Sequence, residues 1–223
     1  MNYTSIFDVI GPNMIGPSSS HTAGACAISL MARRLFNEEI TRVDFTLYGS
    51  FAKTYQGHGT DKALLGGILG FSPDDVRIRD AFAIAKERGV EFNFIEDHSH
   101  DHGHHPNTAD ILMYNGKGRT QFIRGESIGG GRMKIVKINN IDVDFTGEYS
   151  TLIVKQYDRP GVVAHITKCL SEKNVNIAFM RLYREAKGET AYTVIESDHH
   201  IPDEIVDLIN DHENIQKTLV LQV

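Results

Sequence analysis

Cysteine is scarce in this sequence, with only Cys26 and Cys169 among 223 residues. Two thiolates are too few for an iron–sulfur cluster, which is usually held by about four cysteines. Both cysteines fall in stretches with the apolar spacing of amphipathic helices. We therefore expect two free, buried thiols and no disulfide, since disulfides are rare in a reducing compartment.

Long apolar runs and an excess of basic charge are also missing. No apolar stretch approaches the roughly 18 residues that a membrane span needs. The start, Met1–Asp8, lacks the basic-then-apolar layout of a secretory signal. The net charge of −6 gives no basic face for nucleic acid. We therefore expect a cytoplasmic protein whose partners are neither membranes nor nucleic acids.

The first half of the chain mixes helical and strand patterns. The run His21–Phe36 is rich in Ala, Leu, Ile and Met and predicts a helix, with Ser20 as its N-cap and Arg33 and Arg34 in its last turn. Alternating apolar and polar residues predict a strand at Arg42–Tyr48. Further helices are predicted at 63–69 and 80–88, and strands at 90–95, 111–114, 119–124, 133–138 and 141–145. We expect an α+β fold here, a mixed α/β domain with its helices early and its strands late.

The pattern becomes short and regular after Gly147–Ser150. Strands are predicted at 151–156, 175–183, 190–197 and 215–223, and helices at 160–173 and 202–211. Pro160 suits the first turn of a helix, where its missing N–H costs nothing. The order, βαββαβ within about 75 residues, is that of a ferredoxin-like fold. We therefore divide the chain into domains 1–147 and 148–223.

Three segments of the first domain combine residues that suit a binding or catalytic site. Gly16–Gly24 (GPSSSHTAG) is a hydroxyl-rich entry to a helix, where free N–H groups suit a carboxylate or phosphate, although capping alone would also explain its serines. Gly57–Asp61 (GHGTD) places His58 between glycines, which let a backbone approach another surface closely. His105–Ala109 (HPNTA) stands at the entry to a strand.

Histidine is concentrated in one stretch, since five of the eleven histidines lie between His98 and His105. Imidazoles bind zinc and nickel, but alternating histidine and acidic residues in a loop are typical of adventitious binding. We predict no metal site there. The turn at Ser127–Arg132 (SIGGGR) would suit either an anion or a tight bend. The histidines that we expect to be replaceable together with little effect are His98, His100, His102 and His104.

The second domain resembles ACT domains over the whole C-terminal third. Its loop Asp158–Gly161 (DRPG) matches the signature loop of that family, and Val175–Ile177 (VNI) fits it as well. The resemblance implies a homodimer, paired side by side, with a small amino acid such as L-serine bound between the copies. By the family's pattern, Gln156, Asp158 and Asn176 would contact this effector. A turn residue at Asp158 and a strand entry at Asn176 are the plainer alternatives.

The first domain is similar to the β chain of bacterial iron–sulfur-dependent L-serine dehydratases. The segments SSSHTAG, YGSFA (Tyr48–Ala52), GHGTD, HPNTA and SIGGG appear in that order, and with the ACT-like tail they cover essentially the whole chain. The resemblance implies an α subunit that holds a [4Fe–4S] cluster. It also implies that L-serine loses water to give aminoacrylate, which hydrolyses to pyruvate and ammonia. The histidine-rich insertion before His105 departs from the family's pattern.

The residues present fit a share in that chemistry. Removing hydroxide from serine needs a Lewis acid on the hydroxyl, a base for the Cα proton and a clamp for the carboxylate. This chain lacks the cysteines for the cluster, but it has imidazoles near neutrality. We expect an active site at the contact with the α subunit, with His58 as the base, His21 orienting the substrate and His105 completing the site. The residues expected to bind substrate are Ser18, Ser19, Ser20, Thr22, Thr60, Asp61 and Asn107.

Two other functions remain open from the sequence. The first domain also resembles the allosteric substrate-binding domain of some phosphoglycerate dehydrogenases, which implies a purely regulatory serine-binding module. The histidines in the motifs argue against it, because a simple anion site does not need them. The histidine-rich stretch alternatively allows a metal-binding protein, which equilibrium dialysis with zinc or nickel would test.

Overall fold

The computed structural model describes residues 13–98 and 103–222. The chain separates into two compact units, residues 1–139 and 140–223. The division falls in the turn between strands β5 and β6, ahead of the boundary expected from composition. No helix among the described residues is long and apolar enough to cross a membrane.

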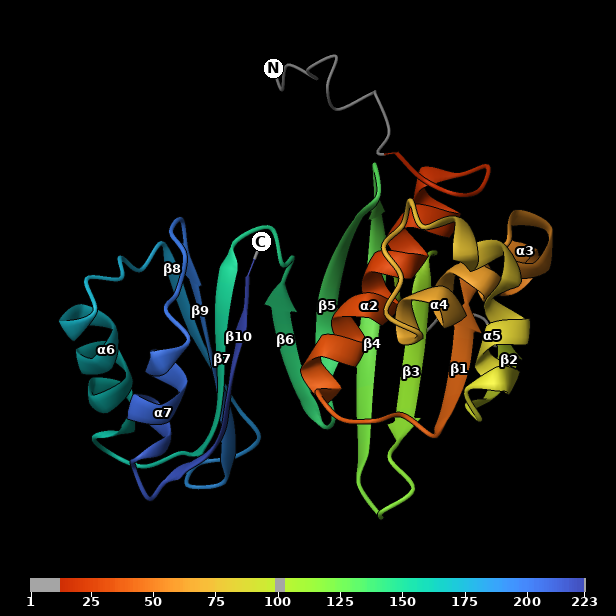
Figure 1. The fold of residues 1–223 in the computed structure, drawn as a ribbon. Helices are drawn as coiled ribbons and strands as arrows, with labels where there is room; N and C mark the ends of the chain where they lie inside the picture. The colour runs from red at the N-terminus through yellow and green to blue at the C-terminus, as the bar shows by residue number, and fades with distance from the viewer. Residues whose placement is uncertain (1–12, 99–102, 223) are drawn as a thin grey trace. The chain divides into compact units, whose positions relative to one another are not determined.

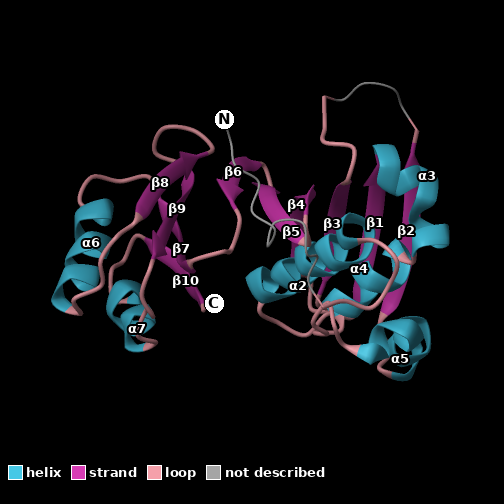
Figure 2. Ribbon diagram, turned by 90° about the horizontal axis from the view of Figure 1, so that it is seen from above, coloured by secondary structure: helices cyan, strands magenta, loops and turns pink. Residues whose placement is uncertain are grey.

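The first unit is a sheet with helices on one face (Figures 1 and 2). Its strands run in the order β2-β1-β3-β4-β5, with β1 parallel to β2 and antiparallel pairing from β1 through β3 and β4 to β5. The strands are β1 (Arg42–Tyr48), β2 (Glu91–Asp97), β3 (Thr108–Tyr114), β4 (Thr120–Gly129) and β5 (Arg132–Ile138), and the next strand, β6 (Ile141–Phe145), belongs to the second unit. The helices are a π-helical turn (Ser19–Ala23), α2 (Gly24–Phe36), α3 (Gly49–His58), α4 (Thr60–Ile68), a 3-10 turn (Val76–Asp80) and α5 (Ala81–Glu87).

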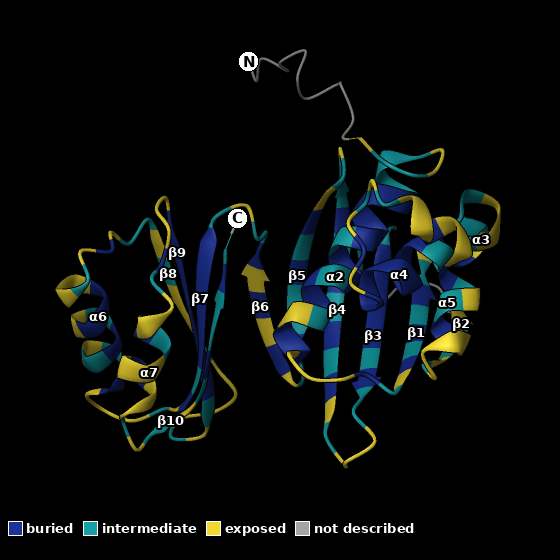
Figure 3. Cartoon of the chain, viewed as in Figure 1, coloured by how far each residue is buried: buried dark blue, intermediate teal, exposed yellow. Residues whose placement is uncertain are grey.

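The core of this unit lies between the sheet and α2 and α4 (Figure 3). Alternate residues of the strands point to that side, as period-2 patterning requires: Phe45 of β1 lies opposite Ile111 of β3, and both are fully buried. Helices α2 and α4 approach each other very closely at Gly67. A Cβ there would lie 2.5 Å from the carbonyl oxygen of Cys26 and 2.6 Å from the amide nitrogen of Leu30. Glycine is therefore required where the two helices meet.

The second unit has the predicted βαββαβ order, and this part of the fold is confirmed. Its elements are β7 (Ser150–Tyr157), α6 (Val162–Glu172), β8 (Phe179–Arg184), β9 (Thr190–Ser197), α7 (Glu204–Asn210) and β10 (Ile215–Leu221). The sheet runs β10-β7-β9-β8, and the helices cover one face of it (Figure 2). Leu152, Ile166 and Ile195 are among the fully buried residues of that core.

Four local predictions need correction. Helix α3 was not expected, because the stretch buries little beyond Phe51 and Ala52 and so lacks a long apolar stripe. The cap before α2 is Ser18, whose side chain accepts from the amide of His21, and not Ser20. Helix α6 begins at Val162, so Pro160 lies in the preceding turn. Strand β8 begins only at Phe179, which leaves Asn176 in the loop before it.

The two cysteines are free and buried, as predicted. Cys26 lies in α2, where its Sγ donates to the carbonyl of Phe71 over 3.3 Å. Burial first, and then the carboxylates of Asp75 and Asp74, together raise the pKa of this thiol to about 12. The thiolate is therefore disfavoured there, and the side chain acts as a small core residue.

Candidate functional site

His21 stands at the start of the helix pair formed by the π-helical turn and α2. Its Nδ1 lies 3.1 Å from the hydroxyl of Ser20 and 3.4 Å from that of Ser18. Its Nε2 lies 2.9 Å from the hydroxyl of Ser50, the second residue of α3, which follows the end of β1. Both ring nitrogens thus have hydroxyl partners, which hold the imidazole in one orientation. π-Helical turns are rare and often occur at functional sites.

His58 packs against His21 from the other end of α3. The two ring centroids are 4.9 Å apart at an angle of 62°, and His21 also meets the ring of Phe51 at 5.4 Å. His58 is the last residue of α3, and Gly59 follows it with a φ of 70°. A Cβ at Gly57 or Gly59 would meet nothing within 4 Å, so these glycines do not serve close packing within the chain. Gly59 instead supplies the left-handed conformation that joins α3 to α4.

The segment before β3 reaches the same place through its backbone. The carbonyl of Pro106 accepts hydrogen bonds from the amides of Ser50 (2.7 Å) and Phe51 (3.4 Å). Gly49 allows this contact: its φ is +52°, and a Cβ there would lie 2.7 Å from the Pro106 oxygen. His105 directly precedes Pro106, and its Nδ1 accepts from the amide of Asn107 over 3.2 Å. The structure thus brings two histidine side chains together and holds the third by its backbone neighbour.

The surroundings of His21 favour its neutral imidazole. Burial lowers the pKa of His21, and the neighbouring His58 lowers it further because two adjacent imidazoles resist a second positive charge. A neutral imidazole can accept a proton, which is the requirement for a general base. The arrangement can therefore carry out proton transfer next to a hydroxyl-lined helix start.

Several buried polar atoms of this unit have no hydrogen-bond partner within the described residues. They are Nδ1 of His58, Oγ1 of Thr60, Oδ1 of Asn107 and Oγ of Ser127. The main chain of Asn107 is engaged, since its carbonyl accepts from the amide of Ser127 over 2.9 Å. Buried polar groups are nearly always satisfied in folded proteins, so each such atom calls for an explanation. Three of these residues lie in segments that the sequence singled out, and Ser127 opens the SIGGG segment.

The remaining predicted substrate-binding residues have different surroundings. Ser19 is half-buried within the π-helical turn. The hydroxyl of Thr22 is buried and donates to the carbonyl of Ser18, so the structure uses it locally. Asp61 is half-buried in the first turn of α4 and accepts from the amide of Lys62 over 2.7 Å. Burial raises the pKa of Asp61, against the opposing effect of that hydrogen bond.

Sequence reasoning missed Ser50 as a site residue and a charged network on the other face of the sheet. Asp110 accepts from Arg124 at both oxygens (2.5 and 2.7 Å) and from the hydroxyl of Tyr48 over 2.8 Å. Arg124 also donates to Nε2 of His104 over 3.0 Å. Burial and the bond to Asp110 raise the pKa of Tyr48 to about 12. Ser50 had a signal, because it follows a glycine directly after a strand; the network had none, because its members are far apart in sequence.

His104 therefore differs from the other histidines of its stretch. It packs edge-on against Tyr48 with ring centroids 5.3 Å apart, whereas His98 forms an exposed ion pair with Glu96. That all four histidines can be replaced together with little effect stays a prediction, and His104 is the member of the four whose replacement would remove contacts with Arg124 and Tyr48. His100 and His102 lie outside the described residues, so the absence of a metal site in the stretch His98–His105 stays a prediction.

The chain's residues do not fit an iron–sulfur cluster. Cys26 is fully buried with a raised pKa, and Cys169 lies in the other unit. Within residues 13–98 and 103–222, no group of three or more His, Cys, Asp or Glu side chains is placed to hold a metal ion.

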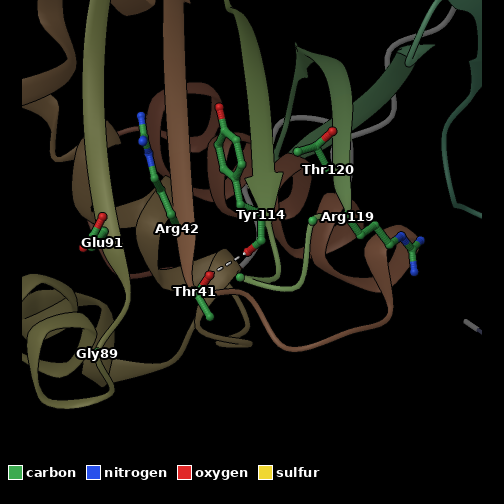
Figure 4. A pocket seen from close by; sticks show the side chains of 9 residues that line it. Thr41, Arg42, Gly89, Glu91, Tyr114, Arg119 and Thr120 are labelled. Carbon is green, nitrogen blue, oxygen red and sulfur yellow. Dashed lines mark hydrogen bonds between the residues drawn. The ribbon is translucent and has the colours of Figure 1, made fainter.

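A hollow of about 370 Å³ lies at the opposite end of the first sheet and does not belong to this site (Figure 4). Both of its arginines already have partners: Arg42 pairs with Asp44 at 2.8 Å, and Arg119 pairs with Glu38. Figure 4 shows the Arg119 side chain pointing away from Arg42 and Tyr114. The hollow therefore lacks the convergent free groups of a binding site.

The three predicted effector residues of the second unit are not gathered in one place. Gln156 is buried at the end of β7, where it accepts from the hydroxyl of Thr193 over 3.1 Å. Asp158 accepts from the amide of Gly188 (3.1 Å) and from Arg184 (3.3 Å), which lower its carboxyl pKa. Asn176 is exposed before β8, which runs parallel to β7 because both are antiparallel to β9. Asn176 and Asp158 thus lie towards opposite ends of the sheet.

Comparisons with known proteins confirm both resemblances. A family described as "Serine dehydratase beta chain" matches residues 5–137, and one described as "ACT domain" matches residues 150–214. The L-serine dehydratase beta chain of Peptoniphilus asaccharolyticus is 42% identical over 194 residues, 87% of each chain. The probable L-serine dehydratase beta chain of Bacillus subtilis is 42% identical over 216 residues, 96% of each chain. The D-3-phosphoglycerate dehydrogenase of Bacillus subtilis is 28% identical over 180 residues, 80% of this chain and 34% of the relative.

Proposed function

We propose a function on the premise that the chain belongs to the serine dehydratase beta chain family and carries an ACT domain. It is the subunit of an L-serine dehydratase that works with a cluster-bearing α subunit to convert L-serine to pyruvate and ammonia. The cluster belongs to the α subunit, because the cysteines here do not fit it. The proposal keeps the cytoplasmic location expected from the sequence.

The single observation that carries the proposal is the convergence of His21, His58 and Ser50. Two segments meet there, the π-helical turn that carries His21 and helix α3 that carries Ser50 and His58. Both nitrogens of His21 have hydroxyl partners, and Nδ1 of His58 is buried without a partner among the described residues. Leaving polar atoms buried and unpaired costs free energy, about 1–3 kcal/mol each. A ligand or a partner surface that supplies the missing partners would recover that cost. This supports an active site completed by another subunit.

In the proposed reaction His58 accepts the Cα proton of L-serine on its imidazole. His21, held by Ser20 and Ser50, orients the substrate, and the helix start at Ser18 offers amide groups to the carboxylate. Loss of the hydroxyl group is assigned to the partner subunit. Aminoacrylate then takes up water and releases ammonia to give pyruvate, and the imidazolium returns its proton to solvent.

We further propose that the second unit pairs with another copy to sense a small amino acid, L-serine in the first instance. The separation of Asp158 from Asn176 supports this, because a small amino acid cannot span both within one chain. Strand β8 is an edge of its sheet and exposes Leu182, and exposed edges are ready pairing surfaces.

The catalytic proposal is tested by anaerobic reconstitution with the α subunit and measurement of pyruvate. Replacing a general base typically costs 10²–10⁴-fold, so we expect His58→Gln to lose about that much kcat with an unchanged circular dichroism spectrum. His98→Gln is the matched control, because His98 is exposed and its side chain is seen, among the described residues, to contact only the carboxylate of Glu96. Near-wild-type turnover of His58→Gln would refute the assignment of the base.

The purely regulatory alternative makes a different prediction for the same assay. A module that only senses serine would leave kcat unchanged in His21→Gln and His58→Gln at saturating substrate. The similarity to D-3-phosphoglycerate dehydrogenase supports this alternative, but at 28% identity it is more distant than the 42% identity to the serine dehydratase beta chains. Loss of kcat in both variants would decide for the catalytic role.

A further inference from the structure

A small cavity of about 190 Å³ lies within the second unit on the sheet face that α6 and α7 do not cover. The segment 144–149 is held over this face. The carbonyl of Asp144 accepts from Arg181 (2.8 Å) and from the hydroxyl of Tyr183 (3.0 Å), and the ring of Tyr149 meets that of Phe179 at 5.7 Å. The walls are therefore fixed by contacts on both sides.

Glu196 contributes a buried carboxylate to this cavity. It is 7% exposed and follows Ile195 of β9, whose side chain lies in the core beneath α6 and α7. Because side chains alternate along a strand, Glu196 points to the opposite face of the sheet, into the cavity. Its register neighbours are Phe179 on β8 and Thr151 on β7. Within the part of the chain that the structure describes, no hydrogen bond or ion pair reaches its carboxylate. Burial raises the pKa of Glu196; Arg181 opposes this effect, and Asp144 and Glu148 add to it.

Arg181 supplies the opposite charge in the same cavity. It lies on the same face of β8, two residues after Phe179, and its side chain is exposed. One of its nitrogens donates to Asp144, and a guanidinium has five N–H donors in a fork that suits a carboxylate. A carboxylate acceptor and a guanidinium donor thus share one small space lined by two aromatic rings.

We propose that this cavity binds a small α-amino acid as its zwitterion, with the ammonium group at Glu196 and the carboxylate at Arg181. The volume corresponds to about six waters at roughly 30 Å³ each, which suits a molecule the size of glycine or serine and exceeds a bare ion. Arg181 also disfavours a bare cation, whereas a zwitterion uses both charges. The aromatic rings of Tyr149 and Phe179 add favourable contacts for an ammonium group.

This site is distinct from the effector residues on the signature loop. The cavity lies at the start of β7, and Asp158 follows its end. The eight residues of β7 span about 26 Å at roughly 3.3 Å per residue. The second unit would then hold two amino-acid sites, and the new one lies within a single chain.

The test uses the full chain without the α subunit, so its outcome is independent of pyruvate formation. Amide chemical shifts are followed while glycine, L-serine or methylammonium is added. We expect glycine and L-serine to shift the amides of Phe179, Arg181 and Glu196, and methylammonium to bind at least about tenfold more weakly because it cannot use Arg181.

Variants decide between the possible causes of those shifts. Glu196→Gln and Arg181→Gln should each weaken glycine binding at this site by about tenfold or more, and Glu185→Gln is the surface control. Glu196→Gln should also raise the melting temperature of the ligand-free chain, because it removes an unpaired buried carboxylate. Three results would overturn the proposal: shifts confined to the Asp158 loop and Asn176, unchanged affinity in Glu196→Gln, or equal shifts with potassium chloride alone.

Discussion

The two units differ in how they treat polar side chains. In the first unit, polar atoms of His58, Thr60, Asn107 and Ser127 are buried without partners among residues 13–98 and 103–222, and the ring nitrogens of His21 lie close to hydroxyl groups at one end of a sheet. In the second unit, the buried amide of Gln156 is paired with Thr193, and Asp158 is tied to the turn before β9. The first unit thus carries unsatisfied groups where its motifs meet. The second satisfies Gln156 and Asp158 around its signature loop, and its buried groups without a partner in the described chain, Thr218 and Glu196, lie away from that loop.

This difference indicates different dependence on other molecules. Unpaired buried groups persist in folded proteins when a ligand, a water or a partner satisfies them in the working state. Groups that are already paired contribute to the fold and give less to a ligand. The first unit therefore has the features of a site that needs a ligand or a partner protein to satisfy its polar groups. The paired groups of the signature loop in the second unit instead have a structural role.

The close contact of α2 and α4 is the strongest test of the first unit. Gly67→Ala should destabilise it by about 3 kcal/mol or more, because its Cβ would press on backbone atoms of Cys26 and Leu30 that cannot move away. Gly57→Ala is the matched control, since nothing lies within 4 Å of its Cβ, and alanine there should stabilise α3 by up to about 1 kcal/mol. Chemical denaturation of both variants measures the effect; equal stability would show that the helices can separate freely.

Replacing Asn176 tests whether the effector site of the second unit needs Asn176 from one chain and Asp158 from another. Asn176→Ala should weaken L-serine binding by roughly 1.5–3 kcal/mol if the residue donates to a charged ligand. Because its side chain lies far from Asp158 in one chain, the loss should appear only at concentrations where the chain is a dimer. Calorimetry and sedimentation at several concentrations check this. An unchanged affinity would remove Asn176 from the effector site.

Much of the fold followed from sequence patterns, because burial imposes them. The βαββαβ order was readable since each strand and helix buries one regular face, as at Leu152 and Ile195. Helix α3 was not, because it buries little beyond Phe51 and Ala52 and is held by contacts to Pro106 instead. A helix specified by tertiary contacts leaves no periodic pattern to find.

The sequence predicts the residues of the site that stand in motifs, but not the contacts that depend on tertiary structure. Motifs singled out His21 and His58, but their contact depends on α3. This helix places Phe51 near its start and His58 at its end against the ring of His21. Ser50 was passed over because its role comes from the position of His21, 29 residues earlier. The pairing of Asp110 with Arg124 depends on strand register, which the sequence does not display.

Paired substitutions of buried hydroxyls sharpen the comparison between the units. Thr193→Val should cost about 1–3 kcal/mol, because it leaves the Gln156 oxygen buried without a donor. Ser127→Ala should change the free energy of unfolding by less than about 0.5 kcal/mol or increase it, because that hydroxyl has no hydrogen-bond partner within the described part of the chain. Urea denaturation at fixed pH measures both. A large cost at Ser127 would mean that its hydroxyl is satisfied in solution.

The smallest expected effect concerns the titration of His21. Its pKa is lowered in the folded chain, so between that pKa and about 6.5 the unfolded state binds more protons. The stability that this group contributes is fully present above pH of about 6.5 and is lost as the pH falls towards the folded pKa. The slope cannot exceed about 1.4 kcal/mol per pH unit, the value for one proton.

His58→Gln should raise the pKa of His21 towards its ordinary value, because the neighbouring imidazole is a cause of the lowering. The second unit offers a matched control, since His165 and His212 form a similar pair with ring centroids 4.9 Å apart. His212→Gln should leave the titration of His21 unchanged. Proton NMR of the imidazole resonances follows both variants. If His58→Gln left the His21 titration in place, burial alone would set that pKa, and the two histidines would not act as an electrostatic pair.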